Sequence, residues 1–323
     1  MSQTWKQTAR RDLMELRGRS SAWSYRRQGS PSVEPTALAC LGLLASGDER
    51  TFAGDLAACC AGADWMAAIQ RSEGALPVSQ SLATPGWATP YAILLWSGVP
   101  GHEAARRRAR TWLLGLNGRT IPHTKGVDLL IGHDSTAVGW PWVDGTHSWL
   151  EPTALAVLAL CREGLAGHPR VGAGIALILN RSLEKGGWNY GNKTVFGRDL
   201  RPQPGPTGVA LLALAACGDR SPAVARALEY LRLTLPSLGS AVSLGWGVLA
   251  LRAHGACPLE ADAWLAACYQ RCAGRADATM GVALLLLAAS DKAIRLIVRP
   301  GTNEATTRKP SNPADPLISR NTS

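Results

Sequence analysis

A chain of 323 residues with 46% apolar content can bury a large hydrophobic core, which excludes a mainly disordered protein. Alanine and leucine dominate and only 2 phenylalanines are present, so closely packed helices are favoured over β-branched strands. The net charge of +10 comes mainly from arginines that are scattered without an interleaved aromatic motif, so we expect no nucleic-acid partner. A basic outer face could still contact a peripheral membrane surface or an acidic protein.

The N-terminal segment, residues 1–19, lacks the apolar stretch that a secretory signal needs. The longest apolar run, residues 280–289, is too short to span a bilayer. Most of the 8 cysteines lie inside apolar segments, and none forms a Cys-x-x-Cys pair, which is typical of reduced core cysteines. These features predict a cytoplasmic protein.

An apolar segment recurs along the chain, with a threonine or serine near its start and a glycine near the end of most copies. The clearest copies are VEPTALACLGLLASGD from Val33, LEPTALAVLALCREG from Leu150 and GPTGVALLALAACGD from Gly205. This punctuation is typical of a short helix. Looser copies bring the number to six, and the six begin near Thr36, Thr89, Thr153, Thr207, Ser243 and Thr279.

Amphipathic segments with arginine and acidic residues on one face alternate with these copies. They cover residues 4–17, 53–70, 102–116, 170–183, 223–233 and 259–271. A helix that is apolar nearly all round is buried, whereas a helix with a charged face lies outside. The sequence therefore predicts an all-α fold, an (α/α)6 toroid in which six inner helices alternate with six outer helices in one closed domain.

The connections between these segments carry tryptophan-rich turns, and one of them is specific. The sequence KGGWNYGN at residues 185–192, a polar loop and then GPTGVALLALAACGD resemble the repeat of squalene-hopene cyclases, and more loosely that of protein prenyltransferase β-subunits. The resemblance extends over residues 23–289 as a periodic pattern. It implies the α/α toroid of the terpenoid cyclase and protein prenyltransferase superfamily, with an isoprenoid-like ligand in a central apolar cavity.

The chain changes character after residue 289. Residues 299–323 are polar, rich in proline, serine, threonine and asparagine, and without periodicity. We therefore predict a toroid domain over residues 1–289 and a disordered polar tail over residues 290–323.

The resemblance also implies where a catalytic acid would lie. A family cyclase carries D-x-D-D followed by T-A at the start of an inner helix, and the middle aspartic acid protonates an alkene. This sequence lacks D-x-D-D and has Glu-Pro-Thr-Ala at the two matching starts, beginning at Glu34 and Glu151, without flanking acids. Each glutamate is either a catalytic acid or a group that complements the positive helix N-terminus, and the second interpretation is favoured.

Residues 121–152 form the densest polar cluster of the chain. Besides Glu151, its candidate catalytic residues are His133, Asp134, Asp144 and His147, and its candidate ligand contacts are Trp140, Trp142 and Trp149. The histidines and aspartates could bind a metal ion or act as an acid-base pair. We expect no cofactor, because the Asp-x-Cys that holds zinc in prenyltransferase β-subunits is absent. Alternatively, the polar groups satisfy the backbone of their own loop.

Tryptophans recur at corresponding positions of the repeats, which indicates stacking between adjacent repeats. These positions are Trp23, Trp87, Trp140, Trp188 and Trp246. Tyr25 and Tyr190 are predicted to face the cavity with Trp142 and Trp149, because aromatic faces attract cations and isoprenoid chains.

Three functions remain open at this point. The first is a lipid enzyme or lipid binder that holds a polyprenyl or triterpenoid chain. The second is a carbohydrate-active (α/α)6 enzyme, with Asp144 and Glu151 as paired carboxylates and Trp142 and Trp149 as sugar platforms. The third is a non-catalytic toroid that serves as a scaffold in a biosynthetic complex.

Overall fold

Inner helices alternate with outer helices in the computed structural model, which describes residues 2–48, 51–82, 84, 86–122 and 131–298. Nearly every residue of the inner helices is buried, because each contacts its ring neighbours, an outer helix and the ring interior. In the described residues these are α2 (Val33–Ser46), α4 (Thr89–Trp96), α7 (Leu150–Arg162), α9 (Pro204–Ala216), α11 (Ala241–Ala253) and α13 (Thr279–Ala288). Each coincides with a predicted copy of the apolar repeat.

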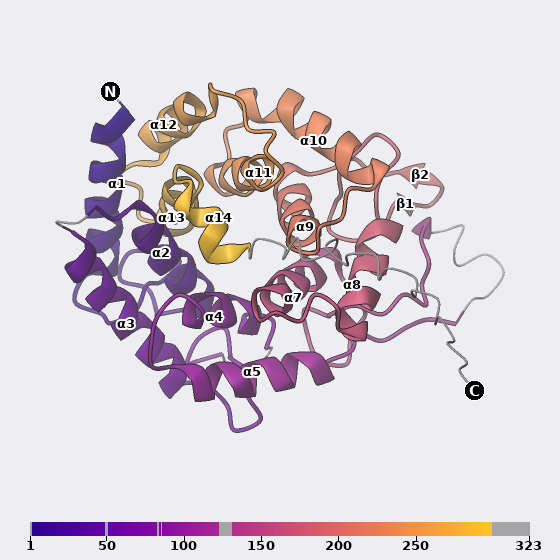
Figure 1. The fold of residues 1–323 in the computed structure, drawn as a ribbon, viewed down its shortest axis with the longest axis horizontal. Coiled ribbons are helices and arrows are strands. Elements are labelled where there is room, and N and C mark those ends of the chain that lie inside the picture. Colours follow the sequence, from indigo (N-terminus) through magenta and orange to yellow (C-terminus); the bar gives the residue numbers. More distant parts are fainter. Residues whose placement is uncertain (1, 49–50, 83, 85, 123–130, 299–323) are drawn as a thin grey trace, which may run out of the picture.

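The outer helices bury only one face. On α5, Ala105, Ala109 and Leu113 are buried at intervals of four residues, whereas Arg107 and Arg108 are exposed. The outer helices are α1 (Ser2–Arg17), α3 (Phe52–Ala68), α5 (Glu103–Gly115), α8 (Pro169–Asn180), α10 (Pro222–Thr234) and α12 (Ala261–Cys272). Figure 1 shows the inner ring inside the outer one. The predicted all-α toroid is therefore confirmed.

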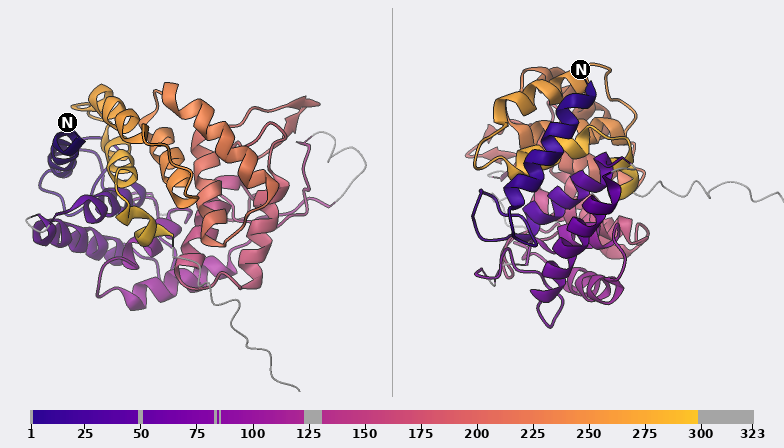
Figure 2. Two further views of the ribbon diagram at one scale, coloured as in Figure 1. Left: turned by 45° about the horizontal axis from the view of Figure 1, so that its top comes forward. Right: turned by 90° about the vertical axis from the view of Figure 1, so that its left-hand side faces the viewer.

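The ring closes where the last helices meet the first. Helix α13 packs against α2, and α1 packs against both α12 and α13. The Lys6 ammonium on α1 donates a hydrogen bond of 2.9 Å to the carbonyl of Ala289, and Tyr269 on α12 donates one to Asp12. Both views in Figure 2 show the indigo N-terminal helix against the orange C-terminal helices. Closure leaves no end helix exposed, as an open solenoid would.

Two glycines allow the inner helices to approach closely. A Cβ atom at Gly42 on α2 would lie 2.9 Å from the carbonyl oxygen of Ala283 on α13. A Cβ atom at Gly208 on α9 would lie 2.6 Å from the backbone of Trp246 on α11. A larger residue at either position would push neighbouring helices apart, so glycine is needed for the tight inner ring.

A pair of hydrogen bonds, here called the tryptophan–threonine bracket, fixes three of the loops. In each bracket the backbone N–H of a tryptophan donates to a threonine Oγ1 at 2.9 Å. The indole Nε1 of the same tryptophan donates to a backbone carbonyl of the preceding outer helix. The brackets pair Trp23 with Thr36, Trp140 with Thr153, and Trp188 with Thr207. The repeat begins with threonine because this hydroxyl holds the loop against the inner helix.

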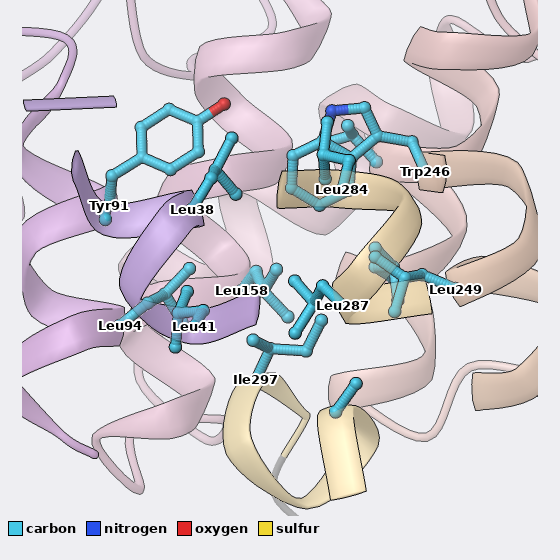
Figure 3. Close-up of a cluster of buried hydrophobic side chains, with 14 of the residues drawn as sticks. Leu38, Leu41, Tyr91, Leu94, Leu158, Trp246, Leu249, Leu284, Leu287 and Ile297 are labelled. Carbon is cyan, nitrogen blue, oxygen red and sulfur yellow. The ribbon is translucent and has the colours of Figure 1, made fainter. Parts of the chain in front are cut away.

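Leucines fill the interior of the ring. Figure 3 shows buried leucines from the inner helices meeting at the centre, among them Leu41, Leu158 and Leu287. Tyr91 and Trp246 lie at one end of this cluster, and Ile297 lies at the other. We call the end that carries Tyr91 the mouth.

A short helix, α14 (Lys292–Ile297), covers the end of the ring opposite the mouth (Figure 1). Ala293 and Ile297 of this helix are buried. The packed ring therefore extends to Val298, and residues 290–298 do not belong to the polar tail predicted from residue 290. The rest of that predicted tail, residues 299–323, lies outside the described residues.

The smaller elements lie on the connections. Strands β1 (Thr194–Val195) and β2 (Arg198–Asp199) form an antiparallel hairpin, and a 3₁₀ turn, η1 (Leu235–Ser237), follows α10. No helix in the described ranges combines the length and apolarity required to cross a bilayer.

Candidate functional site

Two glutamates mark the mouth of the ring. Glu34 lies in the first turn of α2 and Glu151 in the first turn of α7. The two matching Glu-Pro-Thr-Ala sequences thus place a carboxyl group at the same point of two inner helices. The charge of Glu34 raises the pKa of Glu151, so the two groups lie close enough to interact.

Glu34 is held by two tyrosines. The Tyr25 hydroxyl donates to its Oε2 at 2.7 Å, and the Tyr91 hydroxyl donates to its Oε1 at 2.9 Å. Burial raises the pKa of Glu34, and the two hydrogen bonds oppose that shift. Burial and the nearby Glu34 charge also raise the pKa of Tyr91. Both phenols therefore stay protonated and remain donors at neutral pH.

The pKa of Glu151 is shifted close to neutral pH. Burial, and after it the charge of Glu34, raises its pKa to about 7. The carboxyl group is therefore partly protonated at neutral pH, as suits a group that gives and takes protons. Its charge also contributes to the raised pKa of Tyr190, whose side chain is 53% exposed. Tyr190 thus lies near Glu151 on the open side of the mouth.

Two tryptophan rings lie beside Tyr91, the tyrosine that binds Glu34. The rings of Trp87 and Trp142 meet edge to face with centroids 5.0 Å apart, and Trp87 meets Tyr91 in the same way at 6.3 Å. Trp246 on α11 is buried and lies at the same end of the leucine cluster as Tyr91 (Figure 3). The mouth therefore combines acid groups with aromatic faces that suit an apolar chain or a carbocation.

The candidate ligand contacts from the sequence divide into two groups. Tyr25, Tyr190 and Trp149 are each more than a third exposed, and Trp142 is half-buried. Trp140, in contrast, is buried in a tryptophan–threonine bracket, with the Arg170 guanidinium 3.5 Å from its ring centroid. Trp140 supports the wall of the ring, and we leave it out of the site.

The polar loop brings two of the predicted catalytic residues together. His133 and His147 line one cavity of about 270 Å³, together with Trp149 and Arg181. The Nδ1 atom of each histidine lies within hydrogen-bond distance of a backbone carbonyl, at 3.0 Å for His133 and 3.1 Å for His147. A carbonyl only accepts, so each Nδ1 carries the proton. Residues 123–130 of the predicted cluster lie outside the described residues.

The two aspartates of the loop do not join Glu151. Asp134 accepts hydrogen bonds from the backbone N–H and the hydroxyl of Thr136, at 2.8 and 2.6 Å, and so stabilises its own turn. Asp144 is exposed on the following turn. The carboxylate that acts on Glu151 is Glu34, so the glycosidase-type pairing of Glu151 with Asp144 gains no support.

Within the part of the chain that the structure describes, no three His, Cys, Asp or Glu side chains are grouped to hold a metal ion. The sequence predicts no cofactor, because the Asp-x-Cys of zinc-binding prenyltransferase β-subunits is absent, and this stays a prediction.

Solved structures share this fold. A ligand-free tyrosine-to-phenylalanine variant of the type II terpene cyclase MstE from Scytonema matches with a TM-score of 0.59 and 13% identity, over 90% of this chain and 98% of that chain. Two MstE variants in complex with the substrate geranylgeranyl dihydroxybenzoate match with a TM-score of 0.57 and 13% identity, over 91% of this chain and 99% of theirs. No protein-family model and no curated protein matches the sequence. The chain has a terpene cyclase-like fold.

Sequence reasoning found both Glu151 and Glu34, each as either a catalytic acid or a group that complements a helix N-terminus, but not their interaction. Tyr91 and Arg181 were not considered. The repeated Glu-Pro-Thr-Ala sequence was the signal for Glu34, because equivalent positions of two inner helices reach the same end of the ring. Tyr91 lies two residues after Thr89, the equivalent start in α4, which lies between α2 and α7 in the ring.

Proposed function

We propose that this protein binds an isoprenoid chain at the mouth of the toroid and uses Glu151 as the acid-base group that acts on it. The observation that carries the proposal is the pair of interacting carboxyl groups, Glu34 and Glu151, among tyrosine and tryptophan side chains. The substrate geranylgeranyl dihydroxybenzoate of the structurally similar MstE supports a ligand of this class.

The pKa of Glu151 restricts the chemistry. An acid with a pKa near 7 is a weak proton donor, and an unactivated alkene is a very weak base. Such an acid suits a more basic acceptor, for example the oxygen of a terminal epoxide, or the removal of a proton from a carbocation. We therefore propose an oxygen-bearing or otherwise activated isoprenoid, in accord with the absence of D-x-D-D.

Binding and turnover test the proposal separately. Geranylgeraniol binding is measured through the fluorescence of the 12 tryptophans, and isomerisation of epoxy-geranylgeraniol is followed by chromatography and mass spectrometry. We expect saturable binding, and a product of unchanged mass that forms with wild type but at least about 100-fold more slowly with Glu151→Gln. The control is Glu229→Gln, a change on the exposed face of α10, which should behave as wild type.

A non-catalytic toroid remains the second candidate, and the leucine-filled interior of the ring favours it. It predicts that neither the alcohol nor the epoxide binds saturably. Saturable binding without turnover by wild type would support a binding protein and contradict the catalytic part of the proposal.

A further inference from the structure

A buried arginine beside the mouth, Arg181, has a guanidinium nitrogen without a hydrogen-bond partner among the described residues. Arg181 follows α8 and is only 6% exposed, and the nitrogen in question is its Nε. Burial lowers its pKa to about 10, so the side chain still carries its positive charge at neutral pH. A buried charge without full hydrogen bonding is costly, which points to an anionic partner.

Asp134 is the acidic residue that acts on the charge of Arg181. Its Oδ1 already accepts two hydrogen bonds from Thr136, so Asp134 supplies only part of the negative charge and hydrogen bonding that Arg181 needs. Arg181 instead lines the cavity of about 270 Å³ that His133 and His147 share, and Arg119 lines it from the exposed side. Among the described residues, four basic side chains and no carboxylate line this cavity.

The rings of both histidines are held at the wall of this cavity. Their Nδ1 atoms face backbone carbonyls, at 3.0 Å for His133 and 3.1 Å for His147. Serine and asparagine side chains, Ser135, Ser148 and Asn192, add further polar groups to the lining. The cavity thus has the charge and donors that carboxylate and phosphate groups bind.

The cavity adjoins the aromatic side of the mouth. Trp149 and Asn192 line it and also line a second cavity of about 300 Å³, which includes Tyr190 and Leu200. A Cβ atom at Gly191 would lie 2.9 Å from the Trp149 ring and 3.7 Å from Nη1 of Arg181. Trp149 and Arg181 are therefore neighbours, one apolar and one charged, where a ligand with both characters would lie.

From this arrangement we propose that the Arg119–His133–His147–Arg181 cavity binds the anionic head group, a carboxylate or a phosphate, of the isoprenoid ligand. The proposal rests on the proposed function. The hydrocarbon chain would lie on Trp149 and Tyr190. The head group would accept the hydrogen bond from Arg181 Nε that the described residues do not accept.

The test compares ligands that differ only in the head group. Neutral geranylgeraniol, geranylgeranyl diphosphate and geranylgeranyl dihydroxybenzoate are titrated into wild type, Arg119→Gln and Arg181→Gln, with Arg232→Gln on the exposed face of α10 as control. We expect the anionic ligands to bind wild type more tightly than the alcohol. Loss of either arginine should weaken them about tenfold, because hydrogen bonds to charged groups are among the stronger ones. The alcohol and the control should change less than about twofold by the same reasoning.

The outcomes separate the two proposals. If the alcohol and both anionic ligands all fail to bind, the proposed function is wrong. If the alcohol binds and the anionic ligands bind no more tightly, or are insensitive to Arg119→Gln, the head-group site is wrong and the proposed function stands. Arg119 is exposed, so its variant should fold even if Arg181→Gln does not. The anionic ligand that loses more affinity identifies the head-group chemistry.

Discussion

Glu151 couples the chemistry of the mouth to the stability of the fold. Its pKa is raised from 4.5 to about 7, so the folded protein holds this proton more tightly than the unfolded chain does. Between these two pH values the folded state binds more protons, and stability falls as pH rises. The destabilisation is complete above pH 7 and absent below about 4.5.

We predict that Glu151→Gln stabilises the protein at pH 8 and has little effect near pH 4.5. The shift of about 2.5 pKa units corresponds to about 3 kcal/mol as an upper bound, since the side chain is only partly buried. The measurement is the guanidinium midpoint of wild type and variant across this pH range, beside Glu229→Gln. A variant that is equally or less stable at pH 8 would show that the Glu151 carboxylate is not destabilising in the ring.

Tyr25 and Tyr91 explain why two acids can occupy the same mouth. Their hydroxyls give Glu34 two hydrogen bonds, which favour its ionised form against burial. Glu151 has no such support among the interactions that shift its pKa. Equivalent sequence positions therefore acquire different chemistry from their neighbours, and only the folded structure reveals the difference.

At the scale of the element, the tryptophan–threonine bracket joins a loop to an inner helix and to an outer one. Thr36, Thr153 and Thr207 all use Oγ1 in this way, and Thr89 accepts from Leu76 N–H at 2.9 Å. Thr279 opens α13 at the equivalent position, but its buried Oγ1 has no hydrogen-bond partner among the described residues. The last repeat retains the threonine without the bracket.

This difference provides a matched pair of substitutions. Thr153→Val removes the acceptor for the buried Trp140 N–H, so we expect a loss of about 1–3 kcal/mol in the free energy of unfolding. Thr279→Val removes a buried hydroxyl that is unpaired, so we expect a change within about 0.5 kcal/mol or a small gain. Guanidinium unfolding of both variants checks this, and equal losses would contradict the role assigned to the bracket.

The elements themselves were predictable because their signals are local. Apolar repeats opened by threonine located the inner helices, and charged amphipathic segments located the outer ones, within about three residues of their observed bounds. The reason for the threonine was not predictable, since its bond to Trp140 or Trp188 depends on a loop that folds back on the helix. Stacking was predicted for these tryptophans, and hydrogen bonding through both nitrogens is what the structure shows.

At the scale of the whole molecule, closure brings together groups that no local pattern connects. Across the seam, Lys6 on α1 donates to the carbonyl of Ala289, and Tyr269 on α12 donates to Asp12 on α1. The mouth also depends on packing between helices: α4 packs against both α2 and α7, and this brings Glu34 close enough to Glu151 to raise its pKa. The sequence predicted both glutamates as helix starts, but their interaction depends on this distant packing.

Helix α14 was the largest departure from the sequence prediction. Its residues are short of the length that a periodic pattern requires and stand beside a polar segment, so the sequence placed them in the tail. Their burial depends on the open end of the ring, where Ile297 completes the leucine cluster (Figure 3). This packing covers the interior of the ring at that end, so we expect ligands to enter from the mouth.

Ile297→Ala tests how firmly α14 covers this end of the ring, and it leaves the side chains of the mouth unchanged. The substitution removes buried apolar contacts next to Leu158 and Leu287, and a large-to-small change of this kind costs about 2–5 kcal/mol. Leu233→Ala on α10 removes a side chain that is 73% exposed and should change stability by less than about 0.5 kcal/mol. Guanidinium unfolding measures the free energy of unfolding of both variants. A loss for Ile297→Ala no larger than that of the control would show that α14 does not cover this end of the ring tightly. Because Ile297 lies at the far end of the leucine cluster from Tyr91, geranylgeraniol affinity at the mouth should stay within about twofold of wild type while the variant remains folded.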